Sequence, residues 1–403
     1  MPPRLPAARF LPQLTTSPSP SPKPRPNRRR KPPPFPDPYA LPPPPSAFPS
    51  YEPPPFFRYE LIHRSTRSRA RVGRLHTPHG VVDTPGFVAV ATNAALKAVD
   101  HRPLAAELQL IFCNTYHLML HPGPEVVAKA GGLHSFMNRD APIITDSGGF
   151  QVFSLAHGSG ATFRSYRDGT RMLLTPETSV AAQKAFGADI IVPLDELPPY
   201  HIERDALHRS VLLSHRWEAR SLQTHLDDRR KQAMYAVVHG GIDEDLRAMS
   251  AEYLGSLPFD GYGIGGSLGK NRDELFELLR FVMPRLPPDR PNHLLGIADV
   301  DSIVGAVPLG VDTFDSCFPT RLGRHGTLLT RRFGRVQIRQ SKWKSTFEPP
   351  DWEGGLRGHS LAYLHHLWKT HEPMAATLLT LHNIHYMSEM MGRMRQAILN
   401  DEI

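Results

Sequence analysis

Aspartates that end short apolar runs are the residues of this chain best suited to chemistry. Asp146 closes the run 141–145, and Ser147, two glycines and Phe150 follow it. Glycine lets a backbone approach a ligand closely. A carboxylate and an aromatic ring beside exposed amides suit a flat, hydrogen-bonding molecule such as a nucleobase. A tight turn in which Asp146 caps its own backbone would explain the same residues.

Asp195 and Asp315 end two further apolar runs. Two carboxylates can displace a base from a sugar, because this reaction passes through an oxocarbenium-like state, as glycoside hydrolysis does. One acts as nucleophile and the other as acid/base, with net retention. An aspartate can also bind two donors of a guanine edge. Singly, Asp315 could instead cap a turn, with Asp312 as a competitor on the same strand, and Asp195 could be a structural acid beside Glu196.

The elements that must position these acids alternate along the chain. Helical stretches such as 273–282 and 300–307 lie between short apolar runs. The predicted strands are 87–91, 110–114, 143–146, 190–195, 235–239, 261–265, 293–295 and 311–315. This alternation predicts an α/β fold with a parallel sheet. Eight units predict a (β/α)8 barrel whose site lies at the C-terminal strand ends, which carry Asn114, Asp146, Asp195, His239 and Asp315. A doubly wound sheet is the alternative.

Residues 1–56 are predicted to be a disordered leader, and residues 57–403 the barrel domain. The first 55 residues hold 22 of the 42 prolines, which favours polyproline II or disorder. The first 50 hold eight Lys/Arg and one acid, so the remainder of the chain is close to neutral. A basic, acid-poor leader with Ser/Thr is typical of a transit sequence for a plastid or mitochondrion. A Pro-rich tail, a nuclear signal or an RNA-binding arm are the alternatives; without a transit sequence we expect a cytoplasmic protein.

The cysteine count and the lengths of the apolar runs exclude two classes of protein, disulfide-rich and membrane-spanning. The two cysteines, Cys113 and Cys317, allow no disulfide framework and are predicted to be buried thiols. No apolar run is long enough to span a membrane, so we expect no membrane partner.

Several segments, taken in order, resemble the bacterial type of the tRNA-guanine transglycosylase family over residues 59–403. They are FCNTYHLMLHPG at 112–123, DSGGFQVF at 146–153, LDE at 194–196, FDGY at 259–262 before Gly265-Gly266, and DTFDSCFPTRLGRHG at 312–326. The resemblance implies a (β/α)8 barrel with a small C-terminal subdomain that usually binds zinc. It also implies exchange of guanine at the anticodon wobble position for queuine or another 7-deazaguanine base. The implied partners are a tRNA with guanine at that position and a second copy of the chain.

The resemblance assigns roles to matched residues. Asp315 would attack C1′ of the ribose, and Asp146 would handle the proton of the departing and arriving base. Contacts to the base would come from Asn114, Ser147, Phe150, Asp195, His239, Gly240, Gly266 and Leu295. Contacts to the anticodon loop would come from Arg321 and Arg324.

Within the base contacts, the resemblance divides the work. Asp195, with Ser147 and the Gly266 amide, would bind the base edge. Phe150 and Leu295 would sandwich the ring, and Asn114 would support Asp146.

Some positions depart from the family pattern. His239-Gly240 stands where many members have Gln-Gly, and Leu197 where bacterial members usually have Cys. The short segment 265–270 lacks the Glu that meets a cationic aminomethyl precursor, which favours queuine as the incoming base. Asp299 replaces a Lys that often faces the anticodon.

The zinc ligands depart most. Alignment places Asp351, Glu353, Leu356 and His382 at the ligand positions, and only His382 is a ligand of the usual kind. Leucine cannot bind zinc, and a structural site needs four ligands. We therefore expect no metal cofactor and a subdomain held by packing of Trp352, Tyr363, Leu364 and Leu367.

Three rival functions fit parts of the pattern. A non-catalytic RNA-binding partner subunit of the same fold would lose the catalytic acids, whereas all three remain. A barrel glycosidase would not need the Arg321/Arg324 motif. A relative acting at another tRNA position usually carries a further C-terminal RNA-binding domain.

Overall fold

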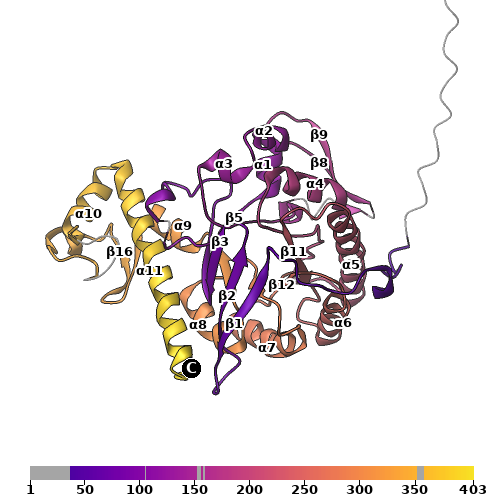
Figure 1. Ribbon diagram of the computed structural model, residues 1–403. Coiled ribbons are helices and arrows are strands. Elements are labelled where there is room, and N and C mark those ends of the chain that lie inside the picture. The colour runs from indigo at the N-terminus through magenta and orange to yellow at the C-terminus, as the bar shows by residue number, and fades with distance from the viewer. Residues whose placement is uncertain (1–36, 105, 152–155, 158, 352–357) are drawn as a thin grey trace, which may run out of the picture. The chain divides into compact units, whose positions relative to one another are not determined.

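Eight parallel strands close into a barrel, in the order β10-β11-β12-β13-β14-β4-β5-β6 (Figure 1). The computed structural model describes residues 37–403, except 105, 152–155, 158 and 352–357. The barrel strands are β4 (Gly86–Val90), β5 (Ile111–Cys113), β6 (Ile143–Thr145), β10 (Ile190–Ile191), β11 (Ala233–Val238), β12 (Gly261–Ile264), β13 (Asn292–Leu294) and β14 (Thr313–Ser316). This confirms the (β/α)8 barrel and excludes the doubly wound sheet.

Helices follow the strands and form the outer layer. They are α1 (Thr115–Leu120), α2 (Pro124–Lys129), α3 (Leu133–Met137), α4 (Pro176–Phe186), α5 (Arg204–Asp227), α6 (Glu244–Gly255), α7 (Arg272–Val282) and α8 (Val300–Ala306). Short 3-10 turns are η1 (Pro45–Ala47), η2 (Arg102–Leu104), η3 (Gly149–Gln151), η5 (Met283–Arg285), η6 (Val307–Leu309) and η7 (Ser341–Ser345). Side chains cap several helices: Asp299 accepts from the Ser302 amide at the start of α8 and pairs with Arg272 at 2.8 Å.

The strand β11 shows how the core is divided. All of its residues are buried, because the side chains of a barrel strand point alternately into the barrel interior and toward the surrounding helices. Ala233, Tyr235 and Val237 belong to the inner cluster. Met234, Ala236 and Val238 belong to the cluster between strands and helices. Two apolar layers therefore fix the strand ends that carry the acids.

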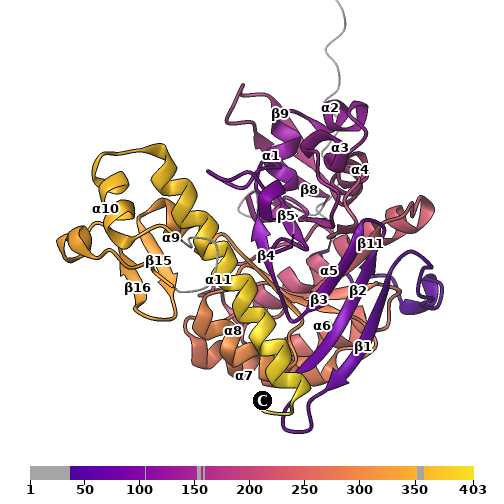
Figure 2. The ribbon, with the colours of Figure 1, turned by 60° about the vertical axis from the view of Figure 1, so that its left-hand side comes forward.

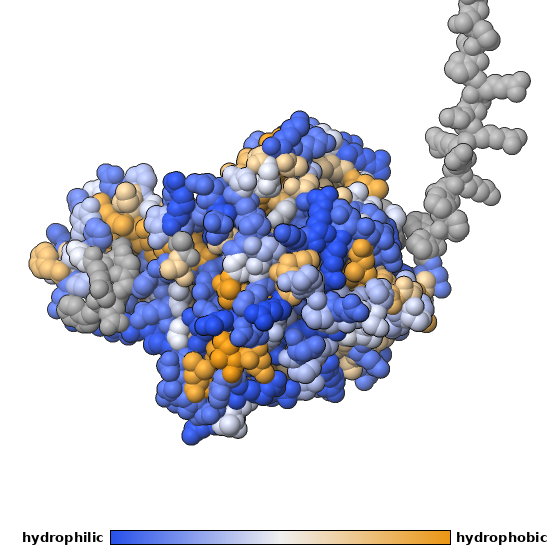
Figure 3. Space-filling view, in the orientation of Figure 1, coloured by the Kyte–Doolittle hydropathy of each residue, from blue (hydrophilic) through white to orange (hydrophobic). Residues whose placement is uncertain are grey.

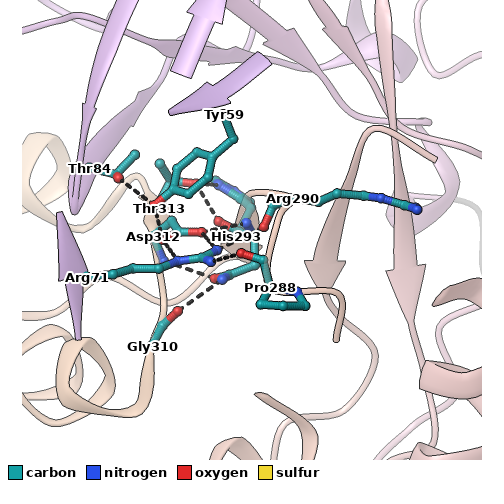
Figure 4. Close-up of polar contacts among 10 residues, drawn as sticks. Tyr59, Arg71, Thr84, Pro288, Arg290, His293, Gly310, Asp312 and Thr313 are labelled. Atoms are coloured by element: carbon teal, nitrogen blue, oxygen red, sulfur yellow. Dashed lines mark hydrogen bonds and ion pairs between the residues drawn. The ribbon is translucent and has the colours of Figure 1, made fainter. Parts of the chain in front are cut away.

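An antiparallel sheet, β1 (Arg58–Arg64), β2 (Arg71–Thr77) and β3 (Gly80–Thr84), precedes the barrel. Asp312 is fully buried and joins this sheet to the barrel: Arg71 Nη2 lies 2.6 Å from its Oδ2 and Tyr59 donates to its Oδ1 at 3.0 Å (Figure 4). Its Oδ2 also accepts from the Asn292 amide. These contacts give Asp312 a structural role, which distinguishes it from the candidate nucleophile Asp315.

The chain before Phe57 also packs on the barrel domain. Tyr39 donates to Asp205 of α5 at 2.8 Å, and the guanidinium of Arg290 lies 3.7 Å from the Tyr51 ring. Tyr253 of α6 donates to the carbonyl of Pro43. Proline-rich chain needs no backbone ladder to dock, because side chains and free carbonyls can make the contacts. The packed chain thus begins before the boundary expected from composition.

The C-terminal part forms a small subdomain beside the barrel (Figure 2). Its elements are α9 (Phe318–Arg324), β15 (Thr327–Thr330), β16 (Gly334–Gln337), α10 (Leu361–Lys369) and α11 (Pro373–Leu399). Leu364 lies in its apolar cluster with Leu328, Val336 and Trp343. Leu367 is buried, whereas Tyr363 is 44% exposed and so does not hold the subdomain together; Trp352 lies outside the described residues.

A second small sheet, β7 (Ala156–His157), β8 (Gly160–Arg164) and β9 (Arg171–Leu174), lies between β6 and α4. The face in Figure 3 is mostly hydrophilic, with an apolar patch near β1, a strand that exposes Leu61 and Ile62. Across the described chain, none of the helices has the length and apolar character needed to cross a membrane.

Candidate active site

A cavity of about 540 Å³ lies where the barrel strands end at their carboxyl side. This size falls in the range of small-ligand sites. Of the residues expected to form the site, the cavity is lined by Asn114, Asp146, Ser147, Phe150, Asp195, Gly266, Leu295, Asp315, Arg321 and Arg324. The fold therefore gathers ten of the twelve candidates around one space, from six different strand ends and α9.

Asp146 follows β6 and is held by neighbouring groups. Its Oδ1 accepts from the Thr115 amide at 2.7 Å, and its Oδ2 accepts from the side-chain amide of Asn114. Asn114 also caps α1 by accepting from the His117 amide. Burial raises the pKa of Asp146 to about 7; the Thr115 and Gly148 amides oppose this rise, and the charges of Asp315 and Asp195 add to it. A carboxyl group in this state can both give and take a proton near neutral pH.

Asp315 lies at the end of β14 and is buried. His293 Nε2 lies 3.0 Å from its Oδ1, and the Gly296 amide donates to the same oxygen at 2.8 Å. His293 is itself held, because its Nδ1 lies 2.8 Å from Thr313 Oγ1. Both contacts fall on one carboxylate oxygen.

Asp195 follows β10 and lines the cavity. Ser147 donates to its Oδ1 at 3.3 Å. Burial raises the pKa of Asp195 to about 6, with Glu196 adding to the rise and Ser147 opposing it. The carboxyl group is therefore sensitive to small changes in its surroundings.

Two expected base contacts lie behind the cavity. His239 is only 2% exposed, and its Nε2 lies 3.3 Å from Asp195 Oδ2. Gly240 has φ +135°, and a Cβ there would lie 2.6 Å from the backbone nitrogen of Arg247. Neither residue lines the cavity. His239 reaches the site through Asp195.

Phe150, Leu295 and two arginines line the cavity from different elements. Phe150, on η3, is 63% exposed, and Leu295 is half-buried after β13. Arg321 and Arg324 lie on α9 at the cavity. Cys317, at the start of α9, is half-buried and lines the cavity, whereas Cys113 is buried and its thiol pKa is raised by burial to about 12.

Three supporting residues were missed from the sequence. His293 contacts Asp315, as described, and Glu218 of α5 lies 3.6 Å from His239 Nε2. Arg247 of α6 is buried and donates to the backbone carbonyls of Val238, Gly241, Gly265 and Ser267. His293 was one signal within reach, because it lies on a predicted strand two residues from Leu295. Nothing in the sequence pattern indicated a role in the site for Glu218 or Arg247.

Two of the four residues expected at the zinc position, Asp351 and His382, are described, and each is bonded to the backbone. Asp351 accepts from the Arg331 amide at 3.1 Å, and His382 Nε2 lies 2.8 Å from the Leu329 carbonyl. Glu353 and Leu356 lie outside the described residues. The described part of this position therefore offers one carboxylate and one histidine, and a leucine such as Leu356 cannot bind zinc.

A second group with metal-ligand side chains occurs where His79, His134 and Asp189 meet. The histidine rings stack at 3.5 Å with planes 17° apart. His79 Nδ1 and His134 Nε2 lie 2.7 and 3.1 Å from the two oxygens of buried Asp189. An ion must lie in the plane of each imidazole it binds, and two stacked rings cannot both satisfy this. We therefore interpret the group as a carboxylate held by two histidines.

The comparisons with known proteins agree with this geometry. Residues 66–403 match the family described as Queuine tRNA-ribosyltransferase. The protein of that name from Protochlamydia amoebophila (strain UWE25) is 54% identical over 376 residues, covering 86% of this chain and 97% of the relative. The one from Chlamydia pneumoniae is 49% identical over 374 residues, covering 86% and 99%. This chain belongs to the queuine tRNA-ribosyltransferase family.

Proposed function

We propose that this chain exchanges guanine at the wobble position of a tRNA anticodon for a 7-deazaguanine base through a covalent intermediate. The observation that carries the proposal is that Asp146, Asp195 and Asp315 line one cavity while their hydrogen-bond partners differ. Different surroundings let three carboxyl groups take three roles. The family match supports a tRNA substrate, and the retained acids argue against a non-catalytic subunit.

The exchange proceeds by two displacements. Asp315 Oδ2 attacks C1′ of the ribose while the bond from C1′ to guanine N9 breaks, and Asp146 gives a proton to the departing guanine. The incoming base loses its N9 proton to Asp146 and displaces Asp315 from C1′. Two inversions leave the sugar configuration unchanged. The contacts of His293 and Gly296 with Oδ1 support Oδ2 as the attacking atom.

The base is held by its edge and its faces. Asp195, aligned by Ser147, accepts from the donor edge of the base, and the Gly266 amide donates to its carbonyl. Phe150 and Leu295 contact the two faces. The substrate guanine must be unstacked from the anticodon loop to enter, which costs least in single-stranded RNA.

The decisive experiment combines Asp315→Asn with exchange of labelled guanine into tRNA. We expect no turnover and no trapped covalent RNA adduct, because an amide is a poor nucleophile. Exchange at the wild-type rate would sink the assignment. Asp273→Asn, at an exposed aspartate of α7 away from the cavity, is the matched control.

We further propose queuine as the incoming base. Leu197 lines the cavity, and from the short segment 265–270 the glycines Gly265 and Gly266 line it. An apolar leucine and two glycines in this part of the cavity support a base with a bulkier side group over the small aminomethyl precursor. Mass spectrometry of tRNA after incubation with queuine or with the aminomethyl precursor tests this choice. Faster incorporation of the precursor would reverse it.

The active unit is proposed to be a homodimer in which one subunit positions the tRNA for the other. Light scattering on the purified protein gives the mass directly, and a monomer at the concentrations of the exchange assay would exclude this arrangement.

We propose that an organellar leader lies within residues 1–56, ahead of the chain from Tyr39 onward that packs on the barrel domain. The family match begins at residue 66, so this segment lies outside it, and its composition is typical of transit sequences. Fusion of residues 1–56 to a fluorescent protein tests the idea. Diffuse cytoplasmic or nuclear signal would contradict it.

A further inference from the structure

Basic side chains line the cavity at three neighbouring strand ends. Lys97 lies between β4 and β5, His117 lies on α1 after β5, and Arg321 lies on α9 after β14; all three line the cavity. The strands β14, β4 and β5 are neighbours in the barrel. The basic groups therefore follow one continuous part of the barrel edge.

The hairpin of β8 and β9, residues 160–174, extends this basic edge. It follows β6, which is the next strand after β5 in the barrel. It holds three arginines, Arg164, Arg167 and Arg171, and one acid, Asp168, and all four are exposed. Asp168 accepts from the Thr170 amide at 3.1 Å and so belongs to the turn of the hairpin. The hairpin as a whole carries an excess of positive charge.

Packing against α1 fixes the hairpin beside the cavity. Phe163 and Leu174 are buried in one apolar cluster, and Tyr116 of α1 packs against that cluster. The ring centres of Tyr116 and Phe163 lie 5.2 Å apart, and both views of the ribbon place β8 and β9 close to α1 (Figures 1 and 2). At the tip, Tyr166 Oη lies 3.2 Å from Nδ1 of His117, a residue of the cavity lining.

The ring of Tyr166 is open to solvent although its hydroxyl group is bonded. The residue is 61% exposed. An exposed tyrosine by itself is ordinary, but the contact with His117 holds this ring in one orientation next to the cavity. A fixed aromatic ring beside cationic side chains is the arrangement that single-stranded nucleic acids bind, because every base has a flat face and every nucleotide a negative phosphate.

The nearby cations lack compensating acids. Burial, with the positive charges of Lys97 and Arg167, lowers the pKa of His117 below its ordinary value. Both cations therefore act on one imidazole. Among the described residues, neither Lys97 nor Arg167 forms an ion pair, and the Arg167 guanidinium lies 5.9 Å from the centre of the Tyr166 ring. Positive groups held together in this way attract an anion.

We propose that Tyr166, Arg167 and Lys97 bind a nucleotide that flanks the wobble guanine, with the Tyr166 ring stacked on its base and the two cations at its phosphate. The inference rests on the proposed exchange at an anticodon loop. When the wobble guanine leaves the stack to enter the cavity, the adjacent base loses a stacking partner. An exposed aromatic ring can replace that partner.

The barrel order supports two separate contacts with the RNA. The hairpin follows β6 and α9 follows β14, with β4 and β5 between them. Arg321 and Arg324 of α9 are already proposed to contact the anticodon loop. A second contact at the hairpin would hold the RNA strand on both sides of the nucleotide whose base enters the cavity.

The first test measures binding of an anticodon stem–loop RNA with guanine at the wobble position, by fluorescence anisotropy. Binding is measured directly, so the result does not depend on turnover. Tyr166→Ala should raise Kd roughly tenfold, because it removes the stacking surface. Tyr166→Phe keeps the ring and should stay within about twofold of the wild type.

The salt dependence tests the cations. Arg167→Ala and Lys97→Ala should each weaken binding and lower the slope of log Kd against log salt concentration by about 0.7, the value for one contact with single-stranded RNA. Arg280→Ala, at an exposed arginine of α7 away from the cavity, is the matched control and should change neither quantity. Affinity for 7-deazaguanine and the melting temperature should stay unchanged in the hairpin variants, since the base contacts come from other residues.

Crosslinking locates the contact. A photoreactive uridine is placed on one side or the other of the wobble guanine in the same stem–loop, and mass spectrometry identifies the modified peptide. We expect one of the two positions to give an adduct within residues 160–174, and Tyr166→Ala to reduce its yield.

The outcomes separate this inference from the proposed function. Wild-type affinity and salt slope in Tyr166→Ala and Arg167→Ala, or adducts on α9 alone, would overturn the hairpin contact and leave the exchange reaction in place. A wild-type protein that neither binds the stem–loop nor exchanges its guanine would instead remove the proposed function, and this inference with it. If Tyr166→Ala fails to fold, Arg167→Ala and the crosslink decide the question.

Discussion

His293 lies between Thr313 and Asp315, with Nδ1 2.8 Å from the hydroxyl and Nε2 3.0 Å from the carboxylate. The ring is 1% exposed, so it cannot turn away from the carboxylate without leaving polar atoms unbonded. This contact fixes the orientation of the proposed nucleophile.

His293→Asn should lower kcat for guanine exchange by roughly 10²-fold, because a small misplacement of a reacting group has that effect. KM for guanine should stay within about twofold, since the proposed contacts to the base edge come from other residues. Steady-state kinetics on tRNA checks both values. His366→Asn, at an exposed histidine of α10, is the control, and an unchanged kcat in His293→Asn would assign His293 a purely structural place.

The raised pKa of Asp146 gives the exchange a pH dependence. Asp146 must be protonated to give a proton to the departing guanine, and burial raises its pKa to about 7. The rate of the first displacement should therefore fall as pH rises above about 7, and single-turnover formation of the covalent adduct measures it. Asp146→Ala should lose about 10²–10⁴-fold in rate and lose this pH dependence. A loss smaller than tenfold would place the acid/base role on another residue.

The two arginines of α9 should act on tRNA and leave the free base unaffected. Arg321→Ala and Arg324→Ala should each raise KM for tRNA and reduce its salt dependence, because each removes a positive charge from the cavity lining. KM for guanine should not change. Lys369→Ala, on α10, tests whether any loss of positive charge has the same effect. Unchanged tRNA binding in both arginine variants would locate the anticodon contacts on other residues.

The histidine–aspartate group at residues 79, 134 and 189 should make stability depend on pH. Contacts with His134 and His79 and the Ile143 amide lower the pKa of Asp189 to about 2 despite burial. A lowered pKa contributes stability above the unfolded value near 4, and that contribution is lost as pH falls toward 2. The hydrogen bond to Asp189 raises the pKa of His79, so its contribution is present below about 6.5 and is lost as pH rises through the raised value.

Asp189→Asn should therefore lower the free energy of unfolding by roughly 2–3 kcal/mol at pH 5 and flatten its decline between pH 4 and pH 2. Denaturant unfolding at several pH values measures this. Equal pH dependence in the wild type and the variant would show that the group does not hold this charge.

Zinc content tests the C-terminal subdomain. We expect purified protein to hold well under one zinc per chain and to keep its melting temperature in chelator, since the described donors at this position are bonded to the backbone. Elemental analysis checks the content. One tightly held zinc would contradict the expectation and would point to His382 Nδ1, a buried nitrogen without a hydrogen-bond partner among the described residues. Loss of that zinc in His382→Ala would then locate the site.

The sequence alone determined the barrel and the end of it that carries the acids. Apolar runs alternating with helical stretches are a local pattern, and parallel strands bring their carboxyl ends to one side. Asp146, Asp195 and Asp315 could therefore be placed around one site before any coordinate was known. The motifs around them also identified the family.

The tertiary structure decided which of several similar side chains do which work. Asp312 and Asp315 lie three residues apart, and only long-range contacts with Arg71 and His293 separate the structural acid from the candidate nucleophile. The contact of Tyr39 with α5 shows that the packed chain begins earlier than its composition indicates. Glu218 reaches His239 because α5 packs against β11 at one particular rotation. That rotation depends on contacts across the fold, which no local pattern of residues can determine.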